Sequence, residues 1–342
     1  MSRYQAAYNN PQGPGDARPT ALQIVKDENC VGALKDKVIF ITGANQGIGL
    51  ETTRALYATG ATIYLGVRDL KKGQEAIDNI LSTSTNADGG SLHLIQMSLD
   101  SLESVRSAAR AFLAQSTKLN ILINNAGIMA APQARTVDGF ESQFGINHLG
   151  HFLLFQLLKP ALLASTTPSF NSRVVVLASS GHRHSGIRFH DINFDEPGSY
   201  DPYISYGQAK TANIYFANEI ERRYGSKGLH ALSLHPGAVW TNLAQFVQPD
   251  KAKEMQEANE GNGIMMNAGQ GAATTVYAAI SKEWEGRGGR YLANCIEQGP
   301  RNPGSRRFDG SECGYATWAY DEKAASELWK LSCELVHVEF QD

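Results

Sequence analysis

The sequence predicts an α/β protein built on one doubly wound parallel sheet with helices on both faces. Three observations support this fold class. Short apolar runs rich in β-branched residues alternate with longer helical patterns along most of the chain. The runs are apolar on both faces, as a sheet covered on both sides requires. The first run stops at a glycine-rich turn that leads into a helical pattern.

Six strands are expected, at residues 37–42, 61–67, 92–97, 120–124, 173–178 and 229–234. A helical pattern follows the first strand through Leu50 and Leu56, and others separate the later strands, at residues 102–112, 144–163, 206–223 and 271–280. An amphipathic pattern at 324–338 predicts a final helix. Because parallel strands require right-handed crossovers, this alternation gives a doubly wound sheet.

The chain divides into an N-terminal arm and one domain. Residues 1–30 begin with a stretch rich in Asn, Pro, Gly and Gln, which predicts a flexible arm. The domain is expected at 31–342. Within it, the segments near 181–205 and 242–269 are too long for ordinary connections, so we interpret them as substrate loops; the tail after residue 299 also breaks the alternation.

Composition narrows the classes of partner. The formal net charge is -3 and no basic stripe is present, so nucleic acid is not an expected partner. No run of 18 apolar residues occurs, which argues against a membrane span. The N-terminus does not resemble a signal or transit peptide. Four scattered cysteines (Cys30, Cys295, Cys313 and Cys333) do not form a disulfide framework, which favours a cytoplasmic location. A homo-oligomer is compatible with the sequence.

The glycine-rich turn after the first strand predicts a pyrophosphate site. Glycines allow a tight turn and close backbone approach, and the following helix N-terminus offers free N–H groups. An unliganded glycine-rich turn is the alternative. The candidate residues are Gly43, Asn45, Gln46, Gly47, Ile48 and Gly49.

The end of the second strand favours NADP(H) over NAD(H). Arg68 stands where an acidic residue would bind the ribose hydroxyls of NAD, and a guanidinium can bind a 2′-phosphate through two hydrogen bonds. Asp69 is expected to cap the next helix, and Lys71 and Lys72 add positive charge. An ordinary surface arginine is the alternative for Arg68.

Tyr206 and Lys210 are the candidate catalytic pair. They are spaced i, i+4 at the start of a predicted helix and therefore share one face. A nearby ammonium favours the phenolate, which lowers the pKa of a tyrosine and suits it to proton transfer. Two serines, Ser179 and Ser180, end a strand 26 residues before Tyr206, on the edge where ligands bind in parallel sheets.

These motifs together resemble the short-chain dehydrogenase/reductase family over residues 35–243. The matching patterns are T-G-x-x-x-G-x-G, N-N-A-G, Y-x-x-x-K and P-G-x-V-x-T. Details at 147–152, 208–213 and 289–292 are similar to the retinol-dehydrogenase-like branch, which includes the WW-domain-containing oxidoreductases. The resemblance implies a Rossmann-type fold and reversible hydride transfer between NADP(H) and a small, hydrophobic ketone, aldehyde or alcohol.

The resemblance also implies roles for individual residues. Ser180, the second serine, would position the substrate oxygen, Lys210 would hold the nicotinamide ribose, and the Asn147 backbone would bind a relay water. Besides Tyr206 and Lys210, the remaining cofactor contacts are implied at Ser98, Leu99, Asn125, Ala126, Gly127, Pro236, Gly237, Val239 and Thr241. Ser98-Leu99 replaces the family's Asp-Leu, so Ser98 and Asp100 both remain candidates for contact with the adenine.

Other functions are compatible with parts of the sequence. A non-catalytic NADP(H)-binding redox sensor or interaction protein is the rival, although such relatives usually lack the Tyr or Lys. An epimerase or dehydratase is disfavoured by the glycine spacing. The cluster His182, His184 and His190 lacks an evident fourth ligand, so no metal is expected. Four apolar residues of the second long loop could form a lid or pack in the core: Trp240, Phe246, Met265 and Met266.

Overall fold

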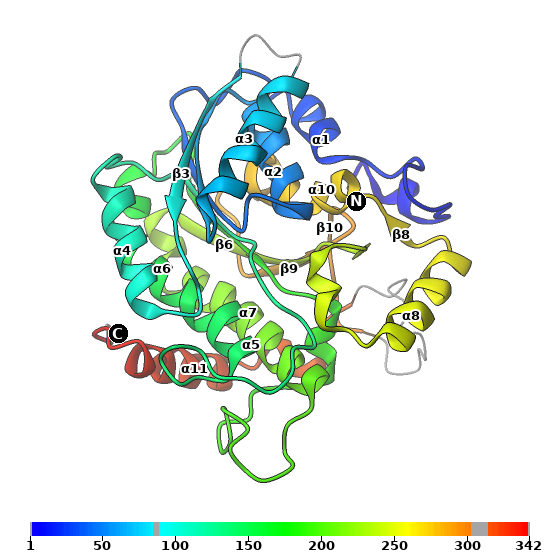
Figure 1. The fold of residues 1–342 in the computed structure, drawn as a ribbon. Coiled ribbons are helices and arrows are strands. Elements are labelled where there is room, and N and C mark those ends of the chain that lie inside the picture. Colours follow the sequence, from blue (N-terminus) through cyan, green and yellow to red (C-terminus); the bar gives the residue numbers. More distant parts are fainter. Residues whose placement is uncertain (1, 85–88, 302–313, 341–342) are drawn as a thin grey trace.

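The computed structural model describes residues 2–84, 89–301 and 314–340. Its centre is an eight-stranded sheet with the order β10-β9-β6-β5-β4-β1-β2-β3, shown in Figure 1. All neighbouring strands are parallel except β9 and β10. The strands are β1 (Val38–Thr42), β2 (Thr62–Val67), β3 (Ser91–Gln96), β4 (Ile121–Asn124), β5 (Ser172–Leu177), β6 (Leu229–His235), β9 (Arg290–Ala293) and β10 (Ile296–Glu297). The predicted doubly wound α/β fold is therefore confirmed.

Strand order reverses between β1 and β4, which are adjacent although β2 and β3 lie between them in the chain. Chain connections leave such a point in opposite directions, so the carboxyl ends of the two strands open a crevice. A second, two-stranded parallel sheet lies beside the crevice and pairs β7 (Ala238–Val239) with β8 (Met265–Met266).

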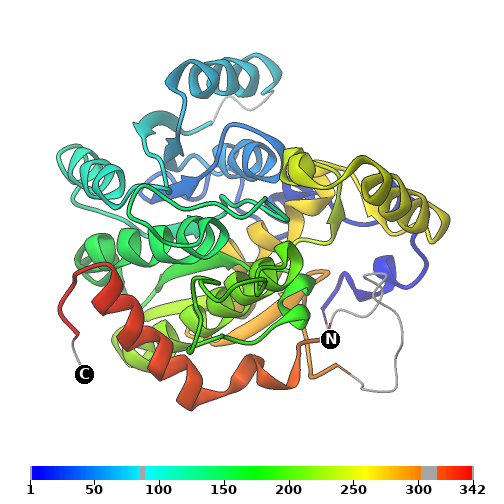
Figure 2. The ribbon, with the colours of Figure 1, turned by 60° about the horizontal axis from the view of Figure 1, so that its bottom comes forward.

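Helices cover both faces of the large sheet (Figure 2). They are α1 (Ala21–Asp27), α2 (Gly47–Tyr57), α3 (Leu70–Thr83), α4 (Leu102–Leu113), α5 (Ser142–Phe144), α6 (Gly150–Ser165), α7 (Pro202–Tyr224), α8 (Pro249–Gly261), α9 (Ala268–Gly271), α10 (Ala273–Ile280) and α11 (Glu322–Leu335). None of the helices in the described ranges is both long and apolar enough to cross a membrane.

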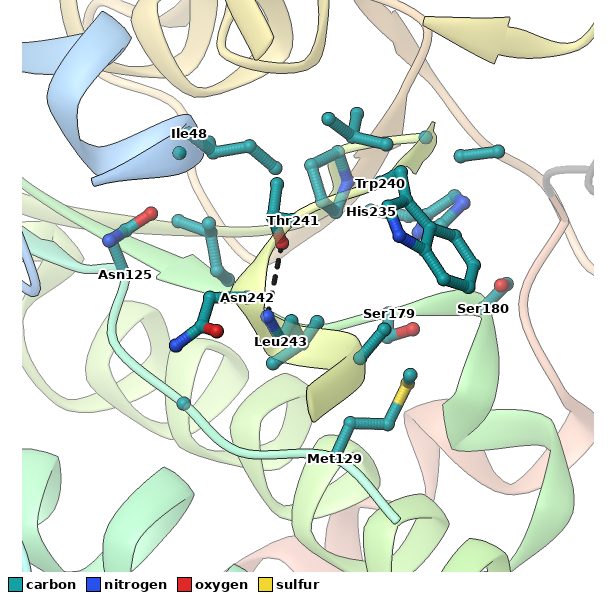
Figure 3. A pocket seen from close by; sticks show the side chains of 18 of the residues that line it. Ile48, Asn125, Met129, Ser179, Ser180, His235, Trp240, Thr241, Asn242 and Leu243 are labelled. Carbon is teal, nitrogen blue, oxygen red and sulfur yellow. Dashed lines mark hydrogen bonds between the residues drawn. The ribbon is translucent and has the colours of Figure 1, made fainter. Parts of the chain in front are cut away.

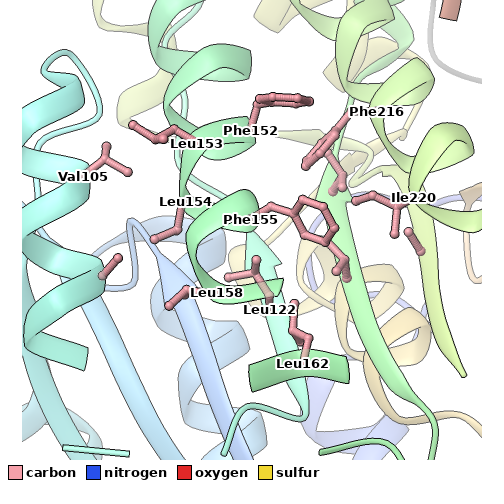
Figure 4. Packing of buried hydrophobic residues seen from close by; sticks show 14 of the residues in the cluster. Val105, Leu122, Phe152, Leu153, Leu154, Phe155, Leu158, Leu162, Phe216 and Ile220 are labelled. Carbon is pink, nitrogen blue, oxygen red and sulfur yellow. The ribbon is translucent and has the colours of Figure 1, made fainter. Parts of the chain in front are cut away.

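Each strand contributes side chains to both layers. Phe40 of β1 packs in the cluster formed with α4, α6, α7 and α11, whereas Ile39 and Ile41 pack on the opposite face with α1, α2 and α10. Figure 4 shows the first of these clusters, where Phe152 and Phe155 of α6 meet Phe216 of α7. The alternation of side chains along a strand explains why apolar runs without polar interruption were the correct signal.

The helix expected at 144–163 is interrupted. Gly145–Leu149 forms a π-helical turn between α5 and α6, and Pro160 lies inside α6. A π-turn inserts an extra residue and shifts the following side chains around the axis, and such turns occur often at functional sites. Here the turn contains Asn147, one of the candidate site residues.

The N-terminal segment is packed on the domain, unlike the flexible arm expected from its composition. Its helix α1 begins at a Thr20 cap, and Ile24 and Val25 are fully buried on the α10 side of the sheet. Tyr4 is buried as well and donates a hydrogen bond to Asp27. The apolar positions 21, 24 and 25 lie on one helical face, and burial of that face outweighs the disorder-promoting composition of the first twenty residues.

The segment expected as a loop at 242–269 also contains regular structure, since it includes a 3-10 turn (Asn242–Phe246), α8 and β8. The segment at 181–205 is mostly irregular after a 3-10 turn at Ser180–His184. The predicted final helix is present as α11. Residues 302–313, which include Cys313, lie outside the described residues, whereas Cys30, Cys295 and Cys333 are buried and free.

Candidate active site

A cavity of about 600 Å³ lies at the carboxyl ends of β1, β4, β5 and β6 (Figure 3). Its wall includes the glycine turn, the N-N-A-G turn, the two serines after β5, the candidate pair Tyr206 and Lys210 on α7 and the segment after β6. Met265 of β8 also lines it, together with three residues of α8 that no sequence motif singles out: Met255, Ala258 and Asn259. Candidate residues far apart in the chain therefore meet at one edge of the sheet.

The glycine turn has the geometry that an anion site needs. Gly43 and Gly47 have positive φ angles of 64° and 53°. A Cβ on Gly49 would lie 2.2 Å from the Gly43 carbonyl oxygen, so only glycine fits there. Gln46 precedes α2 without a side-chain capping bond, which leaves the first N–H groups of the helix directed toward a ligand. Asn45 belongs to the turn but is not part of the cavity wall.

The Thr42 hydroxyl joins the glycine turn to the N-N-A-G turn. Its Oγ accepts hydrogen bonds from the backbone N–H groups of Asn125 (2.9 Å) and Ala126 (3.0 Å). The third partner is His151 Nε2 at 2.8 Å. Because the oxygen already accepts two bonds, we infer that it donates its hydrogen to Nε2, so that the His151 Nδ1–H donates to the Asn147 carbonyl at 3.0 Å.

Asn147 fixes the chain beyond the N-N-A-G turn. Its side-chain oxygen accepts from Ile128 N and its amide donates to Ile128 O, both at 2.9 Å. A Cβ on Gly127 would lie 2.9 Å from the Asn147 oxygen and 3.5 Å from Lys210 Nζ, so the turn needs glycine for this close approach. The Asn147 side chain therefore holds the Gly127–Ile128 backbone in place close to Lys210.

Tyr206 and Lys210 lie one helical turn apart at the cavity, and both are almost completely buried. The α7 helix that carries them begins at an Asp201 cap followed by Pro202. Lys210 Nζ is 5.5 Å from the centre of the Tyr206 ring and donates to the Leu177 carbonyl at 2.9 Å. The predicted pairing on one helical face is therefore present.

The pKa values of Tyr206 and Lys210 differ from the expected ones. Burial raises the pKa of Tyr206 to about 12, and a hydrogen bond with Ser179 only partly opposes this effect. Burial also lowers the pKa of Lys210 to about 7. Desolvation of two polar groups thus dominates over the attraction from which we expected a lowered tyrosine pKa.

Both serines line the cavity, and Ser179 is the one whose hydroxyl lowers the pKa of Tyr206, whereas the family resemblance indicated Ser180. Ser179 caps a 3-10 turn by accepting from Gly181 N at 3.0 Å, and its carbonyl is bonded to His182 Nδ1. Figure 3 places Ser179 near Met129 and Leu243, with Ser180 farther along the wall. A Cβ on Gly181 would lie 2.7 Å from the Tyr206 ring, so the turn after the two serines needs glycine to pass this close to the ring.

Arg68, Ser98 and Leu99 lie outside the cavity wall but at the same sheet edge. Thr42 is in register with Gly66, and Val67 with Gln96, so the chain leaves β2 and β3 beside the glycine turn. Arg68 is exposed there. The next residue, Asp69, accepts from Lys71 N and Lys72 N and has the capping role predicted for it.

The β3–α4 connection contains both candidates for contact with the adenine, Ser98 and Asp100. Asp100 does not cap α4; Ser101 does, by accepting from Ser104 N. Asp100 instead accepts a hydrogen bond from the Ser98 hydroxyl, which places the two adenine candidates in contact with each other. Leu99 packs against Gly150 at the start of α6.

The segment after β6 brings Pro236, Gly237, Val239 and Thr241 to the cavity. Gly237 has a φ of 92°, and a Cβ there would collide with the Met266 methyl group at 1.9 Å. Thr241 accepts from Leu243 N at 3.3 Å, the dashed line in Figure 3. Its methyl carbon would lie 3.2 Å from a Cβ on Gly47, so this segment touches the glycine turn.

The four apolar residues in and beside the second long segment differ in how far they are buried. Met265 and Met266 are buried, whereas Trp240 and Phe246 are 44% and 39% exposed. Trp240 and Met265 line the cavity. The histidines after Ser180 have other partners: His182 is buried between the Ser179 carbonyl and Ala316 N. Within the described ranges, no group of three or more acidic, His or Cys side chains is arranged to bind a metal.

Known proteins resemble the chain over most of its length. The family described as short chain dehydrogenase matches residues 37–189. The short-chain dehydrogenase/reductase prx1 of Penicillium roqueforti is 49% identical over 98% of this chain and 95% of its own length. Retinol dehydrogenase 12 of Mus musculus is 35% identical over 89% and 88%. A solved structure from Mycobacterium paratuberculosis, described as a putative uncharacterized protein, is 34% identical with a TM-score of 0.65, over 90% of this chain and 95% of that one.

The lowered pKa of Lys210 predicts how stability depends on pH. Between pH 7 and 10.5 the unfolded chain holds a proton on this lysine that the folded chain has lost, so stability rises with pH across that window. Lys210→Met removes the desolvation cost. Its melting temperature should exceed that of the wild type by more at pH 6 than at pH 9 when both are measured by calorimetry.

Lys330→Met on the exposed surface of α11 is the matched control, and its difference from the wild type should not change with pH. A constant difference for Lys210→Met as well would show that Lys210 keeps its ordinary pKa in the folded protein.

Proposed function

Because the chain belongs to the short-chain dehydrogenase/reductase family, we propose that it interconverts a carbonyl and an alcohol by hydride transfer with NADP(H). The observation that carries the proposal is the meeting of Tyr206, Ser179 and Lys210 in one cavity beside the glycine turn. The proposed substrate is a small, hydrophobic ketone, aldehyde or alcohol.

The residues present fit a dinucleotide. The uncapped start of α2 and the glycines at 43, 47 and 49 form a backbone cradle, and a side chain at Gly49 would collide with the Gly43 carbonyl that forms part of it. Residues 125–127 and 236–241 would hold the adenosine and nicotinamide ends. When bound, the cofactor supplies or accepts the hydride at the substrate carbon.

Tyr206 would transfer the proton. At neutral pH its high pKa keeps the phenol protonated, which is the form that donates to the oxygen of a carbonyl as the C–H bond forms. In the reverse direction the phenolate takes the proton of the alcohol.

The neighbouring groups would orient this transfer. The Ser179 hydroxyl, which lowers the pKa of Tyr206 and lines the same cavity, would hold the substrate oxygen beside the phenol. Because the pKa of Lys210 is about 7, its amine can gain or lose a proton near neutral pH. It can therefore hold a proton near Tyr206 and form a hydrogen bond with a ribose. The Asn147 carbonyl accepts one bond from His151, and its second lone pair can accept from a relay water.

The cavity wall supports an uncharged substrate. Met129, Leu243 and Met255 line it together with Trp240, and the wall residues within the described part of the chain include no Asp, Glu or Arg. Burial lowers the pKa of His235 to about 3, so this lining histidine is neutral. An ionised substrate would lose hydration here without finding an opposite charge, apart from the lysine.

NADP(H) preference rests on Arg68. Its side chain is exposed at the sheet edge, and the neighbouring carboxylate of Asp69 is engaged in capping α3. A 2′-phosphate would therefore meet a guanidinium and two lysine residues rather than a free carboxylate.

The enzymatic proposal is tested with purified protein, NADPH and a panel of decanal, benzaldehyde, 2-decanone and all-trans-retinal, followed by the loss of NADPH absorbance. Tyr206→Phe should bind NADPH as the wild type does but lose roughly 10²–10⁴-fold in kcat. Tyr203→Phe, one turn earlier on α7, is the control and should stay active. Absence of turnover on the whole panel, with NADPH still bound, would favour the redox-sensor alternative; an active Tyr206→Phe would remove the mechanism.

The choice of serine makes a separate prediction. Ser179→Ala should lower kcat by roughly 10²–10³-fold, because the substrate oxygen loses a hydrogen-bond donor at the reacting centre. Ser180→Ala should retain most activity and is the matched control. Steady-state kinetics on the best carbonyl of the panel distinguish them, and the opposite order of effects would restore Ser180 to the role.

The cofactor preference is tested with Arg68→Ala. The kcat/KM for NADPH should fall by roughly 10–100-fold, the loss expected for charge-assisted hydrogen bonds, while the value for NADH changes little. Arg110→Ala, on the exposed side of α4, controls for general charge removal. A wild-type preference for NADH would contradict the assignment of Arg68.

A further inference from the structure

Helix α8 covers the substrate side of the cavity with almost no packing of its own. Met255, Ala258 and Asn259 line the cavity, yet none of the thirteen residues of α8 is buried. A segment with so few buried contacts opens easily unless its ends are fixed. The position of α8 therefore depends on what holds the chain on either side of it.

The C-terminal end of α8 is held by Arg18 from the N-terminal segment. The Arg18 guanidinium donates to the carbonyls of Ile264 (2.8 Å) and Met265 (2.6 Å), and more weakly to those of Gly263 (3.2 Å) and Gly13 (3.0 Å). Arg18 is only 5% exposed. Ile264, the nearer in sequence of the two strongest partners, lies 246 residues after Arg18. A buried arginine that donates to consecutive carbonyls fixes the backbone of the segment that follows α8.

Asp16 compensates the buried charge. Its carboxylate accepts from Arg18 Nε at 2.8 Å and from Gln270 Nε2 at 3.0 Å. Gln270 in turn accepts from Gly15 N, so α9 is tied to the same segment. Gly13 N donates to the Gly263 carbonyl at 2.9 Å, and a Cβ on Gly263 would lie 2.4 Å from the Pro11 carbonyl oxygen. The N-terminal segment therefore packs closely against the chain that follows α8.

The anchored residues lead directly to the site. Met265 and Met266 form β8, which pairs with Ala238 and Val239 of β7 at the wall of the cavity. Met266 also packs on Gly237. Figures 1 and 2 both show the N-terminal segment, in blue, running beside the yellow segment that contains α8 and β8.

We propose that Asp16 and Arg18 form a latch through which the N-terminal segment sets the position of α8 over the substrate cavity. The latch acts on substrate binding and not on the reacting atoms, so Arg18 is a positioning residue. Its effect on substrate rests on the proposed function, whereas its effect on α8 does not.

The test compares Arg18→Met and Asp16→Asn with the wild type in the full chain. Hydrogen exchange of the amides in residues 249–266 should accelerate by about tenfold or more in Arg18→Met. The acceleration should be smaller in Asp16→Asn, because asparagine lacks the negative charge of Asp16 but has nearly the same size and shape. With NADPH and decanal, KM for decanal should rise about tenfold while kcat changes by less than about twofold.

Arg3→Met is the matched control, because Arg3 bonds within the N-terminal segment, to Glu28 and the Asp27 carbonyl, rather than to the chain that follows α8. Unchanged exchange at 249–266 in both latch variants, equal acceleration in Arg3→Met, or a fall in kcat at constant KM would overturn the proposal. If Arg18→Met does not fold, Asp16→Asn alone decides. If the wild type does not reduce decanal, exchange still decides the latch, and the missing turnover counts against the enzymatic proposal only.

Discussion

The Thr42 hydroxyl connects the three parts of the molecule on which the site depends. It ends β1 immediately before the glycine turn, accepts two backbone hydrogen bonds from the N-N-A-G turn after β4, and reaches α6 through His151. The His151 ring then holds the carbonyl of Asn147 in the π-turn. One oxygen atom therefore fixes the relative positions of the glycine turn, the N-N-A-G turn and α6. Because the network is buried, each of its groups would be costly to leave unpaired.

Burial sets the chemistry of the pair on α7. A phenol and an amine enclosed near the sheet edge both favour their neutral forms, with the pKa of Tyr206 raised and that of Lys210 lowered. The groups therefore lie closer to a proton-donating tyrosine and an easily titrated lysine than to a preformed phenolate–ammonium pair. The arrangement is consistent with an enzyme whose proton is delivered as the hydride is transferred.

The substrate side is built differently from the cofactor side. The candidate cofactor contacts lie in turns at the ends of buried strands, where the backbone is fixed by the ladder. On the other side the cavity wall includes three residues of the exposed helix α8, whose position we propose to depend on the N-terminal segment. A rigid nucleotide site beside an adjustable wall would allow related chains to vary their substrates without disturbing the cradle formed by Gly43, Gly47 and Gly49.

The sequence alone was sufficient for the elements with strong local signals. Apolar runs located six of the eight strands of the large sheet. Five of these strands are buried on both faces, whereas β3 at the edge is only partly buried. The glycine spacing and the i, i+4 pair Tyr206 and Lys210 likewise indicated the candidate site, since each of these signals lies within a few consecutive residues.

Tertiary structure decided what depends on contacts between distant residues. It placed Ser179 as well as Ser180 in the cavity wall beside Tyr206, because the 3-10 turn after β5 and the close approach of Gly181 to the Tyr206 ring bring both serines to the sheet edge. It packed the N-terminal segment through Ile24 and Arg18, whose partners include residues more than two hundred positions away. It also reversed the expected direction of the Tyr206 pKa shift, since desolvation depends on everything that surrounds a side chain and not only on its neighbours in sequence.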